Sequence, residues 1–196
     1  MAPPTTSKET TVEYTEVEQK YRLTGPAQPV KSTLTRLEAK PGTPSRQIDT
    51  YYNAPHRDFL ATEIISEWLR VRVEDATASL NFKRWHPLEA AMKTHCDEYE
   101  STVSDPEAIT RLLAALDYKK IAVVDKVREE WTTSDGQIAV AFDEVADLGT
   151  FIEFEFKGEA DSVEAATACL DEFIADLGAA LGERVHAGYP HLVLGR

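Results

Sequence analysis

The feature that most constrains the fold is an alternation of charged and apolar side chains near the start of the chain. Glu16, Glu18, Lys20 and Arg22 occupy every second position, and apolar side chains occupy most of the positions between them. Side chains two residues apart in a β-strand project from the same face, so this segment predicts a strand with one charged and one apolar face. The apolar face is expected to pack into the protein, so the charged face points elsewhere.

The same alternation recurs in five later segments. Their charged members are Arg70, Arg72 and Glu74; Lys83; Glu98 and Glu100; Lys126, Arg128 and Glu130; and Glu153, Glu155 and Lys157. A solvated face of an antiparallel sheet explains any one of these strands. The whole set favours another arrangement, because these faces carry almost only Glu, Arg and Lys, with acids and bases segregated by strand. We expect a sheet closed on itself, with the charged faces inside and helices covering the apolar exterior.

So many enclosed charges indicate a ligand. Buried charges are costly unless they pair with one another or bind ions. A polyanion together with divalent cations satisfies both signs, because arginines grip phosphate oxygens in forked geometry and carboxylates bind Mg²⁺.

Composition narrows the class of protein. The chain has 196 residues, enough for one domain with a full core, which we place at residues 11–196 after a disordered tail at residues 1–10. Its net charge of −13 disfavours nucleic-acid binding, because the phosphate backbone would be repelled. We expect no membrane span and no signal peptide, free thiols at Cys96 and Cys169, and a cytoplasmic location.

The periodicity also predicts the order of the elements, an α+β arrangement. Strands are expected near residues 12–23, 47–53, 67–74, 79–85, 94–103, 121–132, 137–142 and 150–157. Helices are expected at residues 30–39, from a capped start at residues 104–107, and at residues 161–181, the last as a cover on the barrel exterior. Residues 40–44 predict a loop.

Five segments, in order along the chain, carry a family resemblance. They are Glu16-x-Glu18-x-Lys20, residues 49–55, residues 69–72, Phe82-Lys83 and residues 142–155. They resemble the ExExK signature, the D-x-Y-Y-D-T-P segment, the LRxR strand, the T-x-K strand and the L-D-x-V-x-x-L-G-x-F-x-E-x-E block of the CYTH superfamily. These are the triphosphate tunnel metalloenzymes, which include class IV adenylyl cyclases and thiamine triphosphatases. The last block resembles the CyaB-type branch.

The resemblance implies a closed eight-stranded antiparallel β-barrel that binds a triphosphate and depends on Mg²⁺ or Mn²⁺. Carried over by position, the implied phosphate ligands are Lys20, Arg22, Arg70, Arg72, Lys83, Lys126 and Arg128. The implied metal ligands are Glu16, Glu18, Asp143, Glu153 and Glu155, with Glu98 and Glu100 also lining the tunnel. Lys83 and Tyr51 match a Lys–Tyr pair implicated in catalysis in the thiamine triphosphatase branch.

Two departures from the family pattern concern the rim of the tunnel. Asn53-Ala54 replaces the usual D-T pair, which we expect to remove a carboxylate near the tunnel mouth. The connection between Arg84 and Thr94 is longer than usual, which we expect to alter the rim that recognises the non-phosphate part of the substrate.

Three functions compete at this point. The leading one is hydrolysis of the terminal phosphate of a small-molecule triphosphate, of the thiamine triphosphate or tripolyphosphate type, because it needs only the tunnel, a metal and water. Tyr51, with its pKa lowered by Lys83, is then expected to activate the water. The second is a class IV adenylyl cyclase that forms cyclic AMP and pyrophosphate, and the third is a binding module without turnover. The sequence leaves open whether the protein forms a homodimer.

Overall fold

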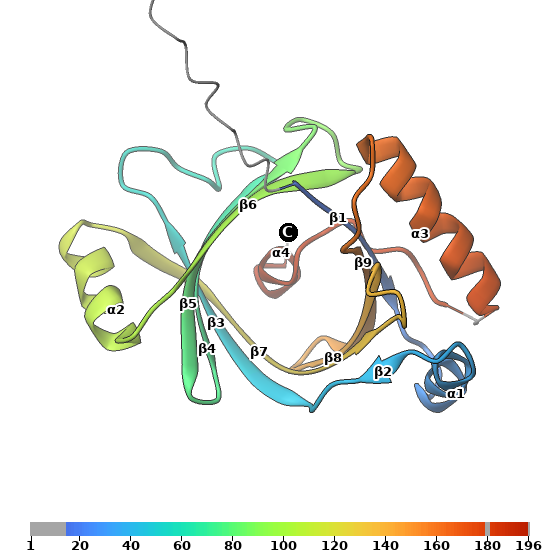
Figure 1. Ribbon diagram of the computed structural model, residues 1–196. Helices are drawn as coiled ribbons and strands as arrows, with labels where there is room; N and C mark the ends of the chain where they lie inside the picture. Colours follow the sequence, from blue (N-terminus) through green and yellow to red (C-terminus); the bar gives the residue numbers. More distant parts are fainter. Residues whose placement is uncertain (1–14, 179–180, 196) are drawn as a thin grey trace, which may run out of the picture.

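The alternating segments form the strands of one closed antiparallel β-barrel in the computed structural model, which describes residues 15–178 and 181–195 (Figure 1). The strands of the barrel are β1 (Thr15–Arg22), β3 (Ser45–Asn53), β4 (Glu67–Glu74), β5 (Thr77–His86), β6 (His95–Thr102), β7 (Lys119–Thr132), β8 (Ile138–Val145) and β9 (Gly149–Phe156). The tail predicted at residues 1–10 lies outside the described residues.

The order of the strands around the barrel is β7-β3-β4-β5-β6-β1-β9-β8, and pairing of β7 with β8 closes it. Every pairing is antiparallel. The first strand therefore lies between two later ones, with Glu16 opposite Cys96 of β6 and Lys20 opposite Glu153 of β9. The eight-stranded barrel predicted from the sequence is confirmed.

One short strand lies outside the barrel. β2 (Lys40–Pro41) pairs with the last residues of β7, with Lys40 opposite Thr132 and Pro41 opposite Trp131. The prediction of a loop over residues 40–44 was wrong for this pair. Proline offers no backbone N–H to a ladder, but it is tolerated in an edge strand such as this one.

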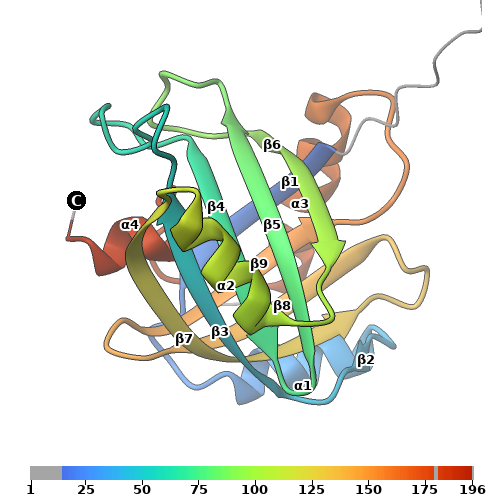
Figure 2. The same cartoon turned by 90° about the vertical axis from the view of Figure 1, so that its left-hand side faces the viewer.

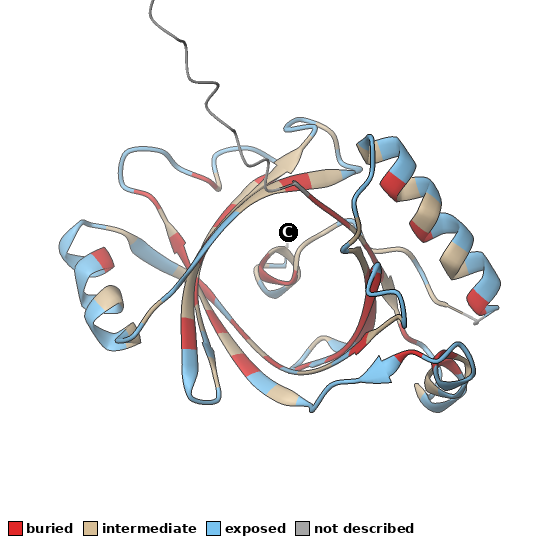
Figure 3. Ribbon diagram, in the orientation of Figure 1, coloured by how far each residue is buried: buried red, intermediate tan, exposed pale blue. Residues whose placement is uncertain are grey.

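Helices cover the apolar exterior of the barrel, as predicted. α1 (Gln28–Arg36) and α3 (Val163–Leu177) pack beside β9, where Leu34 and Leu170 join Ile152 and Phe154 in one buried cluster (Figure 3). α2 (Pro106–Ala115) lies on the far side of the barrel and starts at the predicted cap, where the Asp105 carboxylate accepts from the Ala108 amide at 2.9 Å.

α3 stops earlier than the predicted end at residue 181. Gly178 follows its last turn with a left-handed φ of 60°, a backbone conformation that glycine adopts without strain and that ends helices. Cys169 in this helix and Cys96 in β6 are free, as predicted. No helix of the described residues is both long and apolar enough to span a membrane.

A short helix near the chain end closes one end of the barrel. α4 (Tyr189–Val193) appears within the ring of strands in Figure 1, and Figure 2 places it at one end of the barrel, beside the loops of residues 54–66 and 87–94. We call this the rear end, and we call the opposite end, near β2 and the β4–β5 turn, the mouth. The sequence periodicity did not predict α4, because five residues are too few to show a helical repeat.

Candidate active site

The inward faces of the strands enclose a charged cavity of about 410 Å³. The predicted site residues that line it are Glu16, Glu18, Lys20, Tyr51, Arg70, Arg72, Lys83, Glu98, Glu100, Lys126, Arg128, Glu153 and Glu155. Alternating side chains on several strands thus converge on one lumen, as the closed sheet requires. We call this cavity the tunnel.

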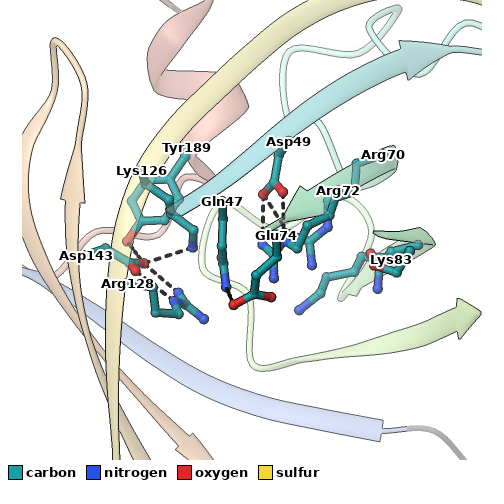
Figure 4. Close-up of polar contacts among 12 residues, drawn as sticks. Gln47, Asp49, Arg70, Arg72, Glu74, Lys83, Lys126, Arg128, Asp143 and Tyr189 are labelled. Carbon is teal, nitrogen blue, oxygen red and sulfur yellow. Dashed lines mark hydrogen bonds and ion pairs between the residues drawn. The ribbon is translucent and has the colours of Figure 1, made fainter. Parts of the chain in front are cut away.

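A buried aspartate fixes two of the arginines from behind. The Arg72 guanidinium donates to Asp49 through Nε at 2.7 Å and Nη2 at 2.8 Å, and Arg70 Nη1 donates at 3.2 Å (Figure 4). The register makes this possible, because Asp49 of β3 lies directly opposite Arg72 of β4. Burial opposes ionisation of the Asp49 carboxyl, but the two arginines lower its pKa well below the ordinary value.

A second buried aspartate, Asp143, holds two basic side chains of β7 in place. Asp143 accepts from Lys126 Nζ at 3.1 Å, Arg128 Nε at 2.7 Å and the Tyr189 hydroxyl at 2.8 Å (Figure 4). Its side chain is fully buried and does not line the tunnel. The resemblance implied a metal ligand here, whereas the structure places Asp143 behind the basic residues, where its oxygens are already occupied.

Tyr189 brings α4 into this network. Its ring lies 4.2 Å from Lys20 Nζ and 5.1 Å from Lys126 Nζ, distances typical of cation–π contact. Burial and the charge of Arg128 lower the pKa of Lys126 to about 7, in spite of Asp143 beside it. An anion in the tunnel would favour the charged form of this lysine.

The carboxylates gather on the opposite wall. Glu153 is paired with Lys20 at 3.1 Å and also contacts Arg128, while Lys83 contacts Glu16 and lies 3.5 Å from Glu98. This wall holds more acids than fixed cations can neutralise. Burial and the Glu153 charge raise the pKa of Glu18 to about 7. Burial and the Glu16 charge likewise raise the pKa of Glu155 to about 8.

These carboxylates suit a divalent cation that shares its ligands with a substrate. Within residues 15–178 and 181–195, no group of three or more His, Cys, Asp or Glu side chains is arranged to hold a metal by itself. Mg²⁺, however, commonly takes one or two carboxylates and fills its remaining positions with water and phosphate oxygens. Glu18 and Glu155, crowded by other acids, have the oxygen chemistry for that role, and the 2.6 Å ion pair of Glu155 with Lys157 engages only its Oε1.

The expected pKa of Tyr51 was wrong. Its side chain is buried and packs edge-on against Trp68, with ring centroids 5.7 Å apart. Burial, with the Asp49 charge, raises the pKa of Tyr51 above the ordinary value. The charges of Arg70 and Arg72 oppose this rise but are outweighed. The Lys83 ammonium group pairs instead with Glu16, Glu18 and Glu98. The phenol therefore stays protonated at neutral pH.

Arg22 and Asn53 lie outside the tunnel wall. Arg22 ends β1, where its Nη1 donates to the Leu148 carbonyl at 3.2 Å and its guanidinium lies 5.0 Å from the Phe151 ring. The side-chain Oδ1 of Asn53 accepts from the backbone amides of Ala54 and Phe59, so this departure from the family pattern shapes the loop after β3. Neither residue lines the tunnel.

Sequence reasoning missed Asp49 and Tyr189 as members of the site. Asp49 lies two residues before Tyr51 in β3 and therefore on the same face of the strand. An acid at this position could have indicated a partner for the arginines. Tyr189 had no such signal, because it lies beyond the last predicted strand and reaches Asp143 through the tertiary fold alone.

Comparison with known proteins agrees with this geometry. The model of the CYTH domain family matches residues 14–175. The chain belongs to the CYTH domain family. The curated protein "Putative adenylate cyclase MJ0240" of Methanocaldococcus jannaschii is 32% identical over 109 residues, a match that spans 56% of this chain and 58% of that relative.

Solved structures share the fold of this CYTH domain. The PH1012 protein from Pyrococcus horikoshii OT3 superposes with a TM-score of 0.74 at 22% identity, covering 91% of this chain and 99% of that one. "Putative adenylyl cyclase HpAC1" from Hippeastrum, described as revealing a dominant triphosphatase activity, superposes with a TM-score of 0.64 at 16% identity. That match covers 93% of this chain and 96% of the other.

Proposed function

We propose that this CYTH domain protein hydrolyses the terminal phosphate of a small-molecule triphosphate, organic or inorganic, with Mg²⁺ or Mn²⁺. The observation that carries the proposal is an enclosed lumen whose arginines are held from behind by Asp49 and Asp143. An anchored guanidinium is oriented before the ligand arrives, so little side-chain entropy is lost on binding.

The free hydrogen-bonding capacity of these side chains supports a phosphate ligand. Arg72 uses Nε and Nη2 on Asp49, which leaves its Nη1 donors for another acceptor. Among the described residues, two buried polar atoms lack a partner: Arg70 Nε, a donor that a phosphate oxygen can satisfy, and Gln47 Oε1, an acceptor that needs a donor such as water. Such atoms are rare in folded proteins and are expected where a ligand or an ordered water completes the bonding.

The chemistry needs positioning and charge stabilisation more than covalent catalysis. Phosphoryl transfer leaves negative charge on the oxygens around the phosphorus, and the tunnel residues Arg72, Arg128 and Lys126 would stabilise it. In this proposal Lys83, which lines the tunnel beside Glu16 and Glu98, would contact a phosphate oxygen, and Tyr51, kept protonated, would donate a hydrogen bond instead of acting as a base. A divalent cation held by Glu18 and Glu155 would supply further charge neutralisation across the phosphate oxygens.

Two related proteins support different chemistries. The triphosphatase activity described for the Hippeastrum protein favours hydrolysis. The name of the Methanocaldococcus relative favours the second candidate, conversion of ATP to cyclic AMP and pyrophosphate. That reaction additionally requires a ribose hydroxyl aimed at the α-phosphorus.

The test is product analysis with separate substrates. The purified protein is incubated with Mg²⁺ or Mn²⁺ and, in turn, tripolyphosphate, thiamine triphosphate and ATP, with an EDTA control. We expect orthophosphate that depends on the metal. If the products from ATP are cyclic AMP and pyrophosphate, the protein is an adenylyl cyclase and the hydrolysis proposal is wrong. If the triphosphates bind but give no product, the protein is a triphosphate-binding module.

A further inference from the structure

A second cavity, of about 360 Å³, lies at the rear end of the barrel. It shares Glu18, Lys20, Trp68, Trp85 and Gly188 with the tunnel, so the two spaces adjoin at these residues, which we call the neck. We call the second cavity the rear chamber. An elongated ligand that passes between these side chains would occupy both spaces.

The two ends of the tunnel differ in chemistry. The mouth is lined by short polar and charged side chains, such as Ser45, Glu74 and Glu130. The rear chamber has more apolar than polar surface, with Ile64, Ile65 and Val185 in its lining, although charged side chains such as Glu63 and Arg184 also line it. An aromatic heterocycle joined to a phosphate chain gains from apolar walls and nothing from acidic ones, so the rear end suits it better.

The wall of the rear chamber is braced by its own hydrogen bonds. Lys93 Nζ donates to Ser66 Oγ at 2.6 Å and to the carbonyl oxygens of Pro87 and Leu88 at 2.8 and 2.9 Å. These bonds tie the loop of residues 87–94 to the start of β4. The ammonium group therefore holds the chamber wall in place, and the long connection after β5 contributes to a formed cavity.

We infer that the rear chamber takes the aromatic organic group of an organic triphosphate. The phosphate chain passes through the neck, and its terminal phosphate points toward the mouth, among the arginines anchored on Asp49 and Asp143. The inference rests on the proposed function for the identity of the phosphate-binding tunnel. It adds the direction in which the substrate lies and the residues that recognise its organic part.

The test fills the rear chamber and measures binding of two ligands, one with an organic group on its phosphate chain and one without. Ala91, an exposed residue, lines the chamber and does not line the tunnel, so Ala91→Trp adds an indole ring at the edge of the space proposed for the heterocycle. The organic probe is adenosine 5′-(β,γ-imido)triphosphate with Mg²⁺, measured by calorimetry. The inorganic probe is tripolyphosphate, measured as KM if it is turned over and by calorimetry if it is not.

We expect Ala91→Trp to weaken binding of the adenosine probe about tenfold or more and to change tripolyphosphate by less than about twofold. The matched control is Met92→Trp, which adds the same ring to a 58% exposed neighbour that lines neither cavity, and it should resemble the wild type. If the first variant fails to fold, Ile64→Trp fills the same chamber from the opposite loop.

Three results would overturn the inference: unchanged binding of the adenosine probe, equal weakening of both probes, or selective loss of that probe in Thr43→Trp at the mouth. The proposed function fails separately. A wild type that binds the adenosine probe through the chamber but turns over no triphosphate would end the hydrolysis proposal and leave the chamber assignment in place.

Discussion

At the scale of single residues, the site depends on acids that never meet the ligand. Asp49 is 1% exposed and receives three N–H donors from Arg70 and Arg72. Removing one member of a buried ion pair leaves the other uncompensated, which costs more than the pair contributes. The anchor therefore stabilises the fold and aims the arginines at the same time.

We predict that Asp49→Asn lowers the free energy of unfolding by about 3–5 kcal/mol at pH 7. The folded-state pKa of Asp49 is depressed, so its contribution is complete above the unfolded value, about 3.9, and is lost as pH falls below it. Urea unfolding at pH 5 and pH 3 should thus show a smaller pH effect in Asp49→Asn than in the wild type. The exposed Asp161→Asn is the control and should keep the wild-type dependence.

Glu18 gives the matching prediction for the acidic wall. Glu18→Gln removes one negative charge from a crowded cluster, so the fold should tolerate it, while one oxygen ligand for the divalent cation is lost. We expect metal-dependent turnover to fall on the order of a hundredfold or more, with a melting temperature close to that of the wild type. Glu144→Gln, at an exposed position of β8, is the control. Full activity in Glu18→Gln would remove Glu18 from the metal assignment.

How far single residues could be placed from sequence depended on the period of the strand. The alternation of side chains along each strand correctly predicted that residues such as Arg70, Lys126 and Glu155 face the lumen, because a strand has only two faces. The alternation does not show how deeply a side chain is buried behind the tunnel wall or where along the barrel it lies. It therefore could not show that Asp143 lies beneath the lining, that Arg22 lies past the tunnel, or that burial raises the pKa of Tyr51.

At the scale of elements, β4 begins and ends where the alternation predicted, and α3 covers the exterior of β1 and β9. Long amphipathic elements repeat their hydrophobic pattern several times and can therefore be predicted from the sequence. β2 and α4 have two and five residues, and their conformations come from pairing with β7 and from docking against the barrel. Such short elements are specified by tertiary contacts, which a local pattern does not contain.

The packing of α3 yields a stability prediction. Leu170 is fully buried between this helix and the barrel, so Leu170→Ala should lower the free energy of unfolding by about 2–5 kcal/mol. Leu112→Ala on α2, where half of the side chain is exposed, should change it by less than about 0.5 kcal/mol. Urea titration measures both. Because Leu170 packs against the outer face of the barrel and not in the tunnel, its variant should retain the wild-type KM below its melting transition.

At the scale of the whole molecule, ligand binding and stability are linked. A ligand at a hundred times its dissociation constant stabilises the folded state by about 2.7 kcal/mol. We predict that tripolyphosphate raises the melting temperature of the wild type and that Arg72→Ala reduces this shift at the same concentration. Arg36→Ala, on the outer helix α1, should behave as the wild type. An undiminished shift in Arg72→Ala would take Arg72 out of the phosphate site.

The position of β1 also bears on how the protein is made. This first strand finds its neighbours in β6 and in β9, the last strand of the barrel. Its partner residues in β9 lie more than a hundred positions further along the chain, so the pairing closes a long loop and is expected to form slowly. During synthesis on the ribosome, the residues of β1 that pair with β9, such as Glu18 and Lys20, must therefore wait until β9 has emerged. The acids and the lysine of β1 remain hydrated until that late step.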